Sequence, residues 1–256
     1  MEAGAGGRPL LLVHGFTGAK EDFADHLSRL AADGWHAVAP DLRGHGVSPA
    51  PASGYGFDAM AVDIVGVADE LGWGRFALLG HSMGGMVVQQ IALDHEARLE
   101  SLVLMSTTHG AVAVDPGLVA LALEVVRSEG MAGLLAAQKA LGGGPFTTDA
   151  AVRLRTRRPD WDAYADSRLL AASPLMYMEA VGQMLAAPSR LEALRRLTVP
   201  TLVIVGEEDR TFRPGSDALA AAIAGAALVV VPGAGHSPHV EEPELWYEAL
   251  MSFLGR

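Results

Sequence analysis

The chain contains no cysteine among its 256 residues. This absence excludes disulfide bonds, thiolate metal sites, iron–sulfur clusters and a thiol nucleophile. It fits the reducing cytoplasm, which is the location that we expect. Basic residues are also scarce, because 19 lysines and arginines face 30 acidic residues and leave a net charge of −11. A negative field of this size repels nucleic acids and anionic lipids, so we expect neither as a partner.

The sequence also lacks a signal-like start and a long apolar run. Residues 1–8 contain no apolar core of the kind that a signal peptide requires. The uncharged stretch 218–232 is short for a membrane span, and it includes Gly225 and Pro232. An alanine-rich helix followed by a glycine stop and a buried strand explains this stretch better. We therefore expect a chain that does not associate with membranes.

Half of the residues are apolar and 19% are charged, which suits one globular domain with a sizeable core. Short apolar runs alternate along the chain with amphipathic segments of helical spacing. The runs predict six strands, at residues 10–13, 36–40, 76–79, 102–105, 201–205 and 228–231. Helices are expected at residues 21–33, 58–71, 83–95, 215–224 and 242–254. This alternation predicts an α/β fold with a mostly parallel sheet that helices cover on both faces.

The interval 110–197 breaks the alternation. It contains no convincing strand, and it is rich in alanine, leucine and methionine at helical spacing. We interpret it as a helical cap inserted between the fourth and fifth predicted strands, with residues 1–109 and 198–256 forming the core domain. An insertion at the carboxyl ends of the strands would overhang a site there. The alternative is a second small domain of unrelated purpose.

The segment Gly80-His81-Ser82-Met83-Gly84 forms a G-x-S-x-G pattern between a predicted strand and a predicted helix. The sharp turn in such a motif requires small residues two positions before and two positions after the serine. The helix N-terminus then directs backbone N–H groups towards the place where negative charge would develop. The pattern predicts Ser82 as a nucleophile, while the plainer alternative is a glycine-rich turn whose serine caps a helix.

A nucleophilic serine needs a base, and the base needs an acid that orients it. His236 follows the last predicted strand, and Asp209 follows the preceding one. Because both residues come after strands of a parallel sheet, they are expected at the same edge as Ser82. They are our candidates for the base and the orienting acid.

Other residues at this edge compete for the same roles. His239 is the second choice for the base, and His14 and His45 also lie in loops at this edge. Glu207 and Glu208 could replace Asp209, but they sit nearer to the strand, where the turn has only begun.

An oxyanion site needs two hydrogen-bond donors. One is expected to be the N–H of Met83, which directly follows the nucleophile. The second is expected in the loop 14–18, where Gly15 permits a close approach and the N–H of Phe16 is the best candidate. The alternative interpretation of this loop is a plain strand-to-helix turn.

Five segments together resemble the α/β-hydrolase superfamily: LLLVHGFTG (10–18), PDLRGHGVS (40–48), LLGHSMGG (78–85), VPTLVIVGEED (199–209) and VPGAGHSPHVEEP (231–243). The resemblance implies a Ser82, Asp209 and His236 triad with Phe16 and Met83 as oxyanion donors. It looks most like capped carboxylesterases, enol-lactonases and cofactor-free haloperoxidases. The serine nucleophile argues against haloalkane dehalogenases and epoxide hydrolases, which use aspartate. Members of the α/β-hydrolase superfamily normally begin with an antiparallel strand pair. About eight residues are available for such a pair here, so we expect one edge of the sheet to be short.

The resemblance implies a serine hydrolase that cleaves small-molecule carboxylic esters with short to medium acyl or aryl groups. This chemistry needs no metal and no organic cofactor. A lactonase, a carbon–carbon bond hydrolase or lyase, and a perhydrolase are alternatives on the same triad, and a non-enzymatic ligand receptor is a third class. The oligomeric state is left open. The candidate pocket residues, each of which could instead be ordinary core, are His81, Trp161, Tyr164, Met176 and Met184.

Overall fold

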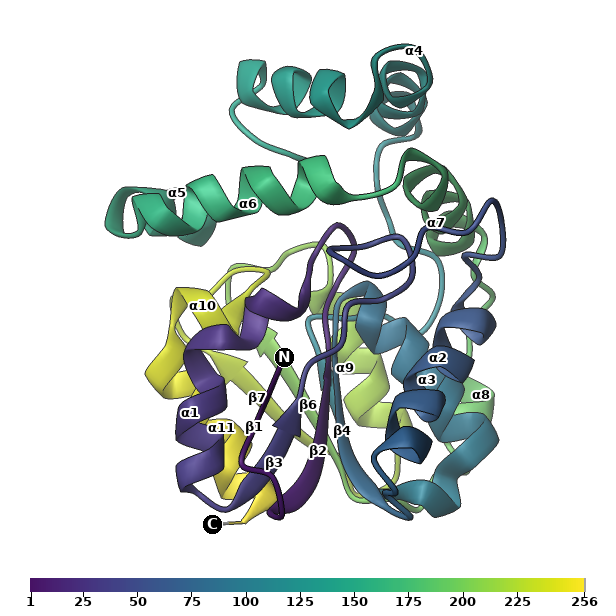
Figure 1. The fold of residues 1–256 in the computed structure, drawn as a ribbon, viewed down its shortest axis with the longest axis vertical. Coiled ribbons are helices and arrows are strands. Elements are labelled where there is room, and N and C mark those ends of the chain that lie inside the picture. Colours follow the sequence, from purple (N-terminus) through teal and green to yellow (C-terminus); the bar gives the residue numbers. More distant parts are fainter. Residues whose placement is uncertain (256) are drawn as a thin grey trace.

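A computed structural model, drawn in Figure 1, describes residues 1–255. Seven strands form one sheet in the order β1-β3-β2-β4-β5-β6-β7. All neighbouring strands are parallel except β1 and β3. The predicted α/β fold with a mostly parallel sheet is confirmed, and all six predicted strands are present. The strands are β1 (Glu2–Ala3), β2 (Arg8–Val13), β3 (Trp35–Val38), β4 (Phe76–His81), β5 (Leu99–Met105), β6 (Thr201–Gly206) and β7 (Ala227–Val231).

The seventh strand, β1, is an addition to the six that the sequence predicts. It has two residues and pairs antiparallel with β3, where Glu2 lies opposite Val38 and Ala3 opposite Ala37. A strand this short carries no periodic pattern, so hydrophobic alternation cannot reveal it. It shortens the exposed backbone edge of β3, which would otherwise be open to pairing with another chain.

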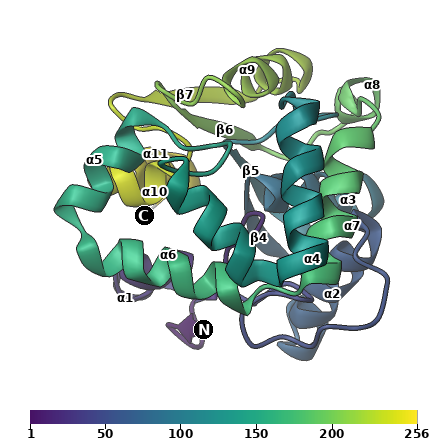
Figure 2. The ribbon, with the colours of Figure 1, turned by 90° about the horizontal axis from the view of Figure 1, so that it is seen from above.

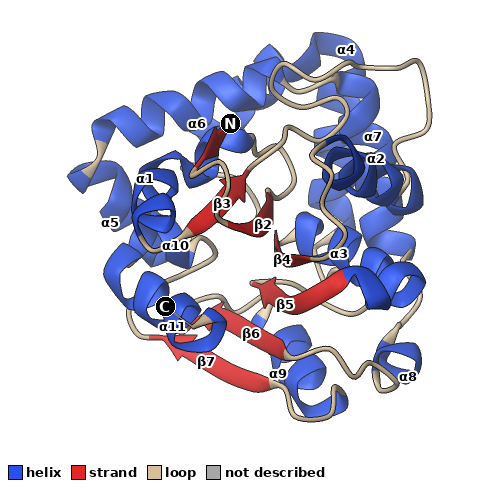
Figure 3. Cartoon of the chain, turned by 60° about the horizontal axis from the view of Figure 1, so that its bottom comes forward, coloured by secondary structure: helices blue, strands red, loops and turns tan. Residues whose placement is uncertain are grey.

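Side chains of the central strands alternate between two apolar cores. Leu11 and Val13 of β2 join the core beneath α2 (Phe57–Glu70), α3 (Met83–His95) and α9 (Arg213–Ala222). Leu10 and Leu12 face the opposite core, beneath α1 (Ala24–Ala32) and α11 (Pro243–Leu254). Figure 3 shows these two helical layers on either side of the strands. Three short helical turns complete the core: η1 (Lys20–Phe23), η2 (Glu96–Arg98) and α10 (Pro238–Glu241).

A helical insertion separates β5 from β6. Its helices are α4 (Pro116–Ala140), α5 (Asp149–Arg157), α6 (Pro159–Ala171), α7 (Pro174–Ala186) and α8 (Leu191–Leu194). Seen from above in Figure 2, α4, α6 and α7 are arranged around the position where β4 ends, whereas α8 packs beside α3 and α9. Within α4, Gly130 adopts φ 67° and ψ −162° and kinks the helix. The boundaries 110 and 197 stay predictions, and Arg256 of the predicted core domain lies outside the described residues.

Ion pairs fasten α5 to the core. Arg153 pairs with Glu208 at 2.7 Å, and Arg158 pairs with Asp25 at 3.1 Å. Arg157 donates a hydrogen bond of 2.9 Å to the carbonyl oxygen of Glu241. Exposed ion pairs of this kind contribute about 0–1 kcal/mol each. Apolar packing elsewhere therefore carries most of the stability, while these pairs set the position of the helix.

Buried histidines are an unusual feature of this core. Burial is the main cause that lowers the pKa of these histidines, and it lowers the pKa of His45 and of His81 to about 3. Both ring nitrogens of His239 lack a hydrogen-bond partner within residues 1–255, and its ring stacks on Phe23 at 5.2 Å. The five histidines that are both buried and lowered in pKa are His14, His26, His45, His81 and His239.

We expect the folded state to lose stability as the pH falls below about 6.5. An unfolded chain binds protons on these histidines near that pH, whereas the folded chain resists protonation down to a lower pH. Each group then removes about 1.4 kcal/mol of stability per pH unit between the two pKa values. Urea unfolding at pH 8, 6.5, 5.5 and 5 measures this loss in the free energy of unfolding. His239→Phe removes one of the five histidines, so the loss should be smaller in this variant by the contribution of that one side chain. Midpoints that stay constant from pH 8 to pH 5 would contradict the expectation.

Candidate active site

Ser82 lies between β4 and α3 in a backbone conformation that few residues other than glycine adopt, with φ 54° and ψ −118°. A Cβ atom built on Gly80 would lie 2.5 Å from the carbonyl oxygen of Gly84. A Cβ atom built on Gly84 would lie 2.3 Å from the carbonyl oxygen of His14. These contacts are with backbone atoms that cannot move aside. The spacing of the two glycines around Ser82 is therefore a steric requirement of the turn.

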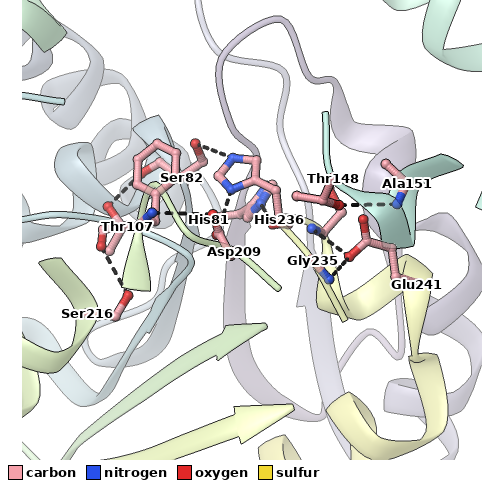
Figure 4. A network of polar contacts seen from close by, with 12 residues as sticks. His81, Ser82, Thr107, Thr148, Ala151, Asp209, Ser216, Gly235, His236 and Glu241 are labelled. Carbon is pink, nitrogen blue, oxygen red and sulfur yellow. Dashed lines mark hydrogen bonds and ion pairs between the residues drawn. The ribbon is translucent and has the colours of Figure 1, made fainter. Parts of the chain in front are cut away.

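Hydrogen bonds from the neighbouring strand fix this turn. The N–H of Ser82 donates to the carbonyl oxygen of Met105 at 2.8 Å, and Thr107 Oγ1 donates to the carbonyl oxygen of Ser82 at 2.7 Å. Ser216 Oγ donates in turn to the carbonyl oxygen of Thr107 at 3.1 Å (Figure 4). Strain of about 1–3 kcal/mol at such a residue persists only when the surroundings determine its conformation in this way.

The structure brings Ser82, His236 and Asp209 into one hydrogen-bonded chain (Figure 4). His236 Nδ1 lies 2.9 Å from Asp209 Oδ2, and His236 Nε2 lies 2.9 Å from Ser82 Oγ. Because a carboxylate only accepts, Nδ1 carries the hydrogen and Nε2 is free to accept from the serine hydroxyl. Asp209 is 2% exposed and also accepts the N–H of Phe212 at 3.3 Å. The acid is therefore shielded from water and held in one orientation.

The competing candidates have other partners. The ring of His239 is buried against Phe23 and forms no hydrogen bond with Ser82. Glu207 accepts the N–H of Gly233 at 3.0 Å, and Glu208 pairs with Arg153. Neither glutamate hydrogen-bonds to His236 within the described chain.

The loop after β2 lies against Ser82. A Cβ atom built on Gly15 would lie 3.1 Å from the Cβ of Ser82, so any larger residue at this position would press on the serine. Within residues 1–255, the N–H groups of Phe16 and Met83 donate no hydrogen bond, and Met83 is the first residue of α3. Both amides are therefore free to donate to a ligand.

His14 fixes the peptide that carries the Phe16 amide. Its Nε2 accepts the N–H of Leu42 at 3.0 Å, so Nδ1 carries the hydrogen and donates to the carbonyl oxygen of Gly15 at 2.8 Å. That carbonyl and the Phe16 N–H belong to one planar peptide group. Anchoring the oxygen therefore also fixes the direction of the N–H.

Two residues that hold the loop around His236 were not recognised as such from the sequence. Glu241 is 2% exposed and accepts the N–H groups of Gly235 at 2.6 Å and Ser237 at 3.1 Å, on either side of His236. Burial raises the pKa of Glu241. His81 donates from Nε2 to the carbonyl oxygen of His236 at 2.8 Å. The only signal for Glu241 is its place five residues after His236, in a turn whose direction the sequence does not reveal.

Two cavities are lined by residues of the insertion. The first has a volume of about 480 Å³ and is lined by Ser82, His236 and several charged side chains. The second has a volume of about 340 Å³ and lies between α4 and α7. Of the residues expected to form the pocket, His81 and Trp161 line the first cavity, and Met184 lines the second.

Tyr164 and Met176 line neither of these cavities. The hydroxyl of Tyr164 donates to Asp22 Oδ1 at 3.1 Å, which turns it towards the ion pair between Asp22 and Arg168. Met176 is fully buried, and its side chain packs against Gly44. Met176 and Met184 both lie on α7, so helical spacing alone does not distinguish the residue that faces the cavity.

Within residues 1–255, no group of three or more histidine, aspartate or glutamate side chains is arranged to hold a metal ion. No helix in the same range is both long and apolar enough to cross a bilayer.

Comparisons with known proteins agree with this fold. The chain is 29% identical over 262 residues to a 2-(acetamidomethylene)succinate hydrolase of Mesorhizobium japonicum, a match that covers 99% of this chain and 90% of that protein. It superimposes on the enol-lactonase of Burkholderia xenovorans LB400 with a TM-score of 0.85 at 25% identity, covering 99% of this chain and 95% of that one. A thermophilic esterase of Thermogutta terrifontis gives a TM-score of 0.85 at 30% identity, covering 99% and 91%.

These likenesses extend over nearly the whole chain. The sequence profile described as "alpha/beta hydrolase fold" matches residues 8–243, a range that includes Ser82, Asp209 and His236. The chain therefore belongs to the α/β-hydrolase family.

Proposed function

We propose that this protein is a serine hydrolase that cleaves carboxylic esters through an acyl-enzyme. The observation that carries the proposal is the continuous chain from Ser82 Oγ through His236 to Asp209, with both links at 2.9 Å. This arrangement can remove the hydroxyl proton at the moment when the oxygen attacks a carbonyl carbon.

In the first step, His236 Nε2 takes the proton of Ser82 while Oγ bonds to the ester carbonyl carbon. The carbonyl oxygen becomes an oxyanion and accepts the N–H groups of Phe16 and Met83. Removal of one such donor typically costs about 2.7–4 kcal/mol of transition-state stabilisation. Asp209 stabilises the imidazolium that forms and keeps the ring in the productive tautomer.

In the second step, the tetrahedral intermediate collapses and the bond to the leaving oxygen breaks. His236 gives its proton to that oxygen, and the alcohol departs. A water molecule then enters, loses a proton to His236 and attacks the acyl carbon. Collapse of this second intermediate releases the acid and returns the proton to Ser82.

The likeness to a solved esterase and to a solved enol-lactonase supports an ester or lactone as the substrate. A lactone is a cyclic ester, so the same steps open its ring and leave the alcohol attached to the acid. Lactone hydrolysis is therefore the second candidate, and product analysis distinguishes it from ester hydrolysis.

We expect Ser82→Ala to lower kcat on p-nitrophenyl esters by about 10⁴-fold or more, because the variant has no nucleophile. The assay covers acyl groups from acetate to palmitate. Ser167→Ala, on the outer side of α6, serves as the control and is expected to match the parent protein. Undiminished turnover by the Ser82 variant, or no covalent labelling of the parent by a fluorophosphonate, would refute the proposed function.

We expect Glu241→Ala to lower kcat by about 10²-fold with little change in KM, because the two amides beside His236 lose their shared acceptor. Glu241→Gln keeps an acceptor oxygen and should retain most of the activity. Glu242→Ala is the matched control at the next position. A Glu241→Ala variant that keeps the parental kcat would rule out this positioning role, and circular dichroism checks that each variant is folded.

A further inference from the structure

The two cavities share part of their lining. Phe16, Phe146 and Tyr177 line both of them. The ring of Phe16 lies 4.8 Å from that of Tyr177, and the ring of Phe146 lies 5.5 Å from that of His236. These three aromatic side chains thus lie between the two cavities, and Phe146 is beside His236.

The first cavity, which we call the polar chamber, contains the reacting side chains together with charged groups. Its wall includes the ion pair between Asp22 and Arg168, in which Asp22 is almost fully buried. The pair between Lys139 and Asp166 also lines it. Cations and anions both line this chamber, so it suits a group that carries hydroxyls or charges.

The second cavity, which we call the apolar chamber, has a different character. Its walls are formed by aliphatic side chains of α4 and α7, including Val119, Ala122, Val125, Val181 and Met184. Burial of a hydrocarbon chain against such walls is favourable by about 0.8 kcal/mol for each methylene group.

Exposed apolar side chains mark the rim of the apolar chamber. Leu118 and Leu121 of α4 are 53% and 56% exposed, and Leu141 is 71% exposed, although all three line this cavity. Their positions give the chamber an apolar mouth towards solvent. A hydrocarbon chain longer than the chamber can therefore extend between them without meeting a polar wall.

The position of His236 decides which part of an ester enters each chamber. His236 must give its proton to the leaving oxygen, so the leaving group stays beside its ring. His236 and Ser82 line the polar chamber and are absent from the lining of the apolar one. Phe16, whose amide is the proposed donor to the carbonyl oxygen, lines both chambers, so the ester carbonyl would lie beside the boundary between them. The acyl chain needs no proton from His236, so it can extend away from His236 into the apolar chamber.

We propose that the protein selects esters that join a medium-length aliphatic acyl group to a polar, hydroxyl- or charge-bearing leaving group. The acyl chain occupies the apolar chamber, and the leaving alcohol occupies the polar chamber. The apolar volume of about 340 Å³ falls within the range of about 300–1,000 Å³ that small-molecule sites display. This inference rests on the proposed ester hydrolysis at Ser82.

Two substrate series test the assignment of the chambers. Along p-nitrophenyl esters from acetate to octanoate, kcat/KM should rise about two- to fourfold for each added methylene group. Among octanoate esters, the glycerol ester should be cleaved faster than the octyl ester, because the octyl group meets charged walls. A kcat/KM that increases with the length of the alcohol and not with the length of the acyl group would overturn the assignment.

A variant that fills the apolar chamber provides a second test. Ala122→Trp places an indole inside it, so the octanoate-to-acetate ratio of kcat/KM should fall about tenfold or more. Ala132→Trp introduces the same side chain at an exposed position of α4 outside both chambers, and it should keep the parental ratio. Equal ratios in the parent and in Ala122→Trp would overturn the proposal.

Labelling of Ser82 separates failure of this inference from failure of the proposed function. Fluorophosphonates that carry a methyl or an octyl group on phosphorus imitate short and long acyl chains. Faster labelling by the octyl probe, and loss of that advantage in Ala122→Trp, would support the proposal. Equal labelling rates would overturn the acyl assignment alone. No labelling by either probe would overturn the serine mechanism itself.

Discussion

Ser82 holds φ 54° at the end of β4, and this conformation exists only because Gly80 and Gly84 leave room for backbone atoms at 2.5 Å and 2.3 Å from where a Cβ would stand. The turn places the Ser82 hydroxyl beyond the carboxyl end of β4, and α3 begins at the next residue. The remaining site is arranged around this fixed point. The loop after β2 approaches the serine through Gly15, and the loops after β6 and β7 bring Asp209 and His236 to it. Only a parallel sheet brings all of these loops to one edge.

The hydrogen-bonded chain and the walls of the two chambers come from different parts of the sequence. All three residues of the hydrogen-bonded chain belong to loops or turns of the sheet domain, and Glu241 and His81 hold the histidine loop from the same domain. The walls of the two chambers come largely from α4, α6 and α7. Changes in the insertion can therefore alter the shape of the chambers while the reacting atoms keep their positions, an arrangement common to folds that support many functions.

The sequence predicted the parallel sheet, because buried strands such as β4 and β6 appear as short apolar runs between helices. It also named the three residues that the structure joins, because the strand ends restrict where a base and an acid can lie. β1 was missed since two residues carry no periodicity. The inward turn of Glu241, the burial of Met176 and the contact between Tyr164 and Asp22 depend on how distant helices pack. Such packing is set by tertiary contacts, which a local pattern does not encode.

The order of the elements along the chain also affects how the protein is made. Ser82 precedes the whole helical insertion, whereas Asp209 and His236 follow it and are attached to β6 and β7, the last two strands at one edge of the sheet (Figure 3). Synthesis proceeds from the N-terminus, and the earlier parts of a chain fold first. A nascent chain that ends between residues 82 and 235 contains Ser82 but lacks His236. The hydrogen-bonded chain through His236 can therefore close only after β7 has been made and has paired with β6.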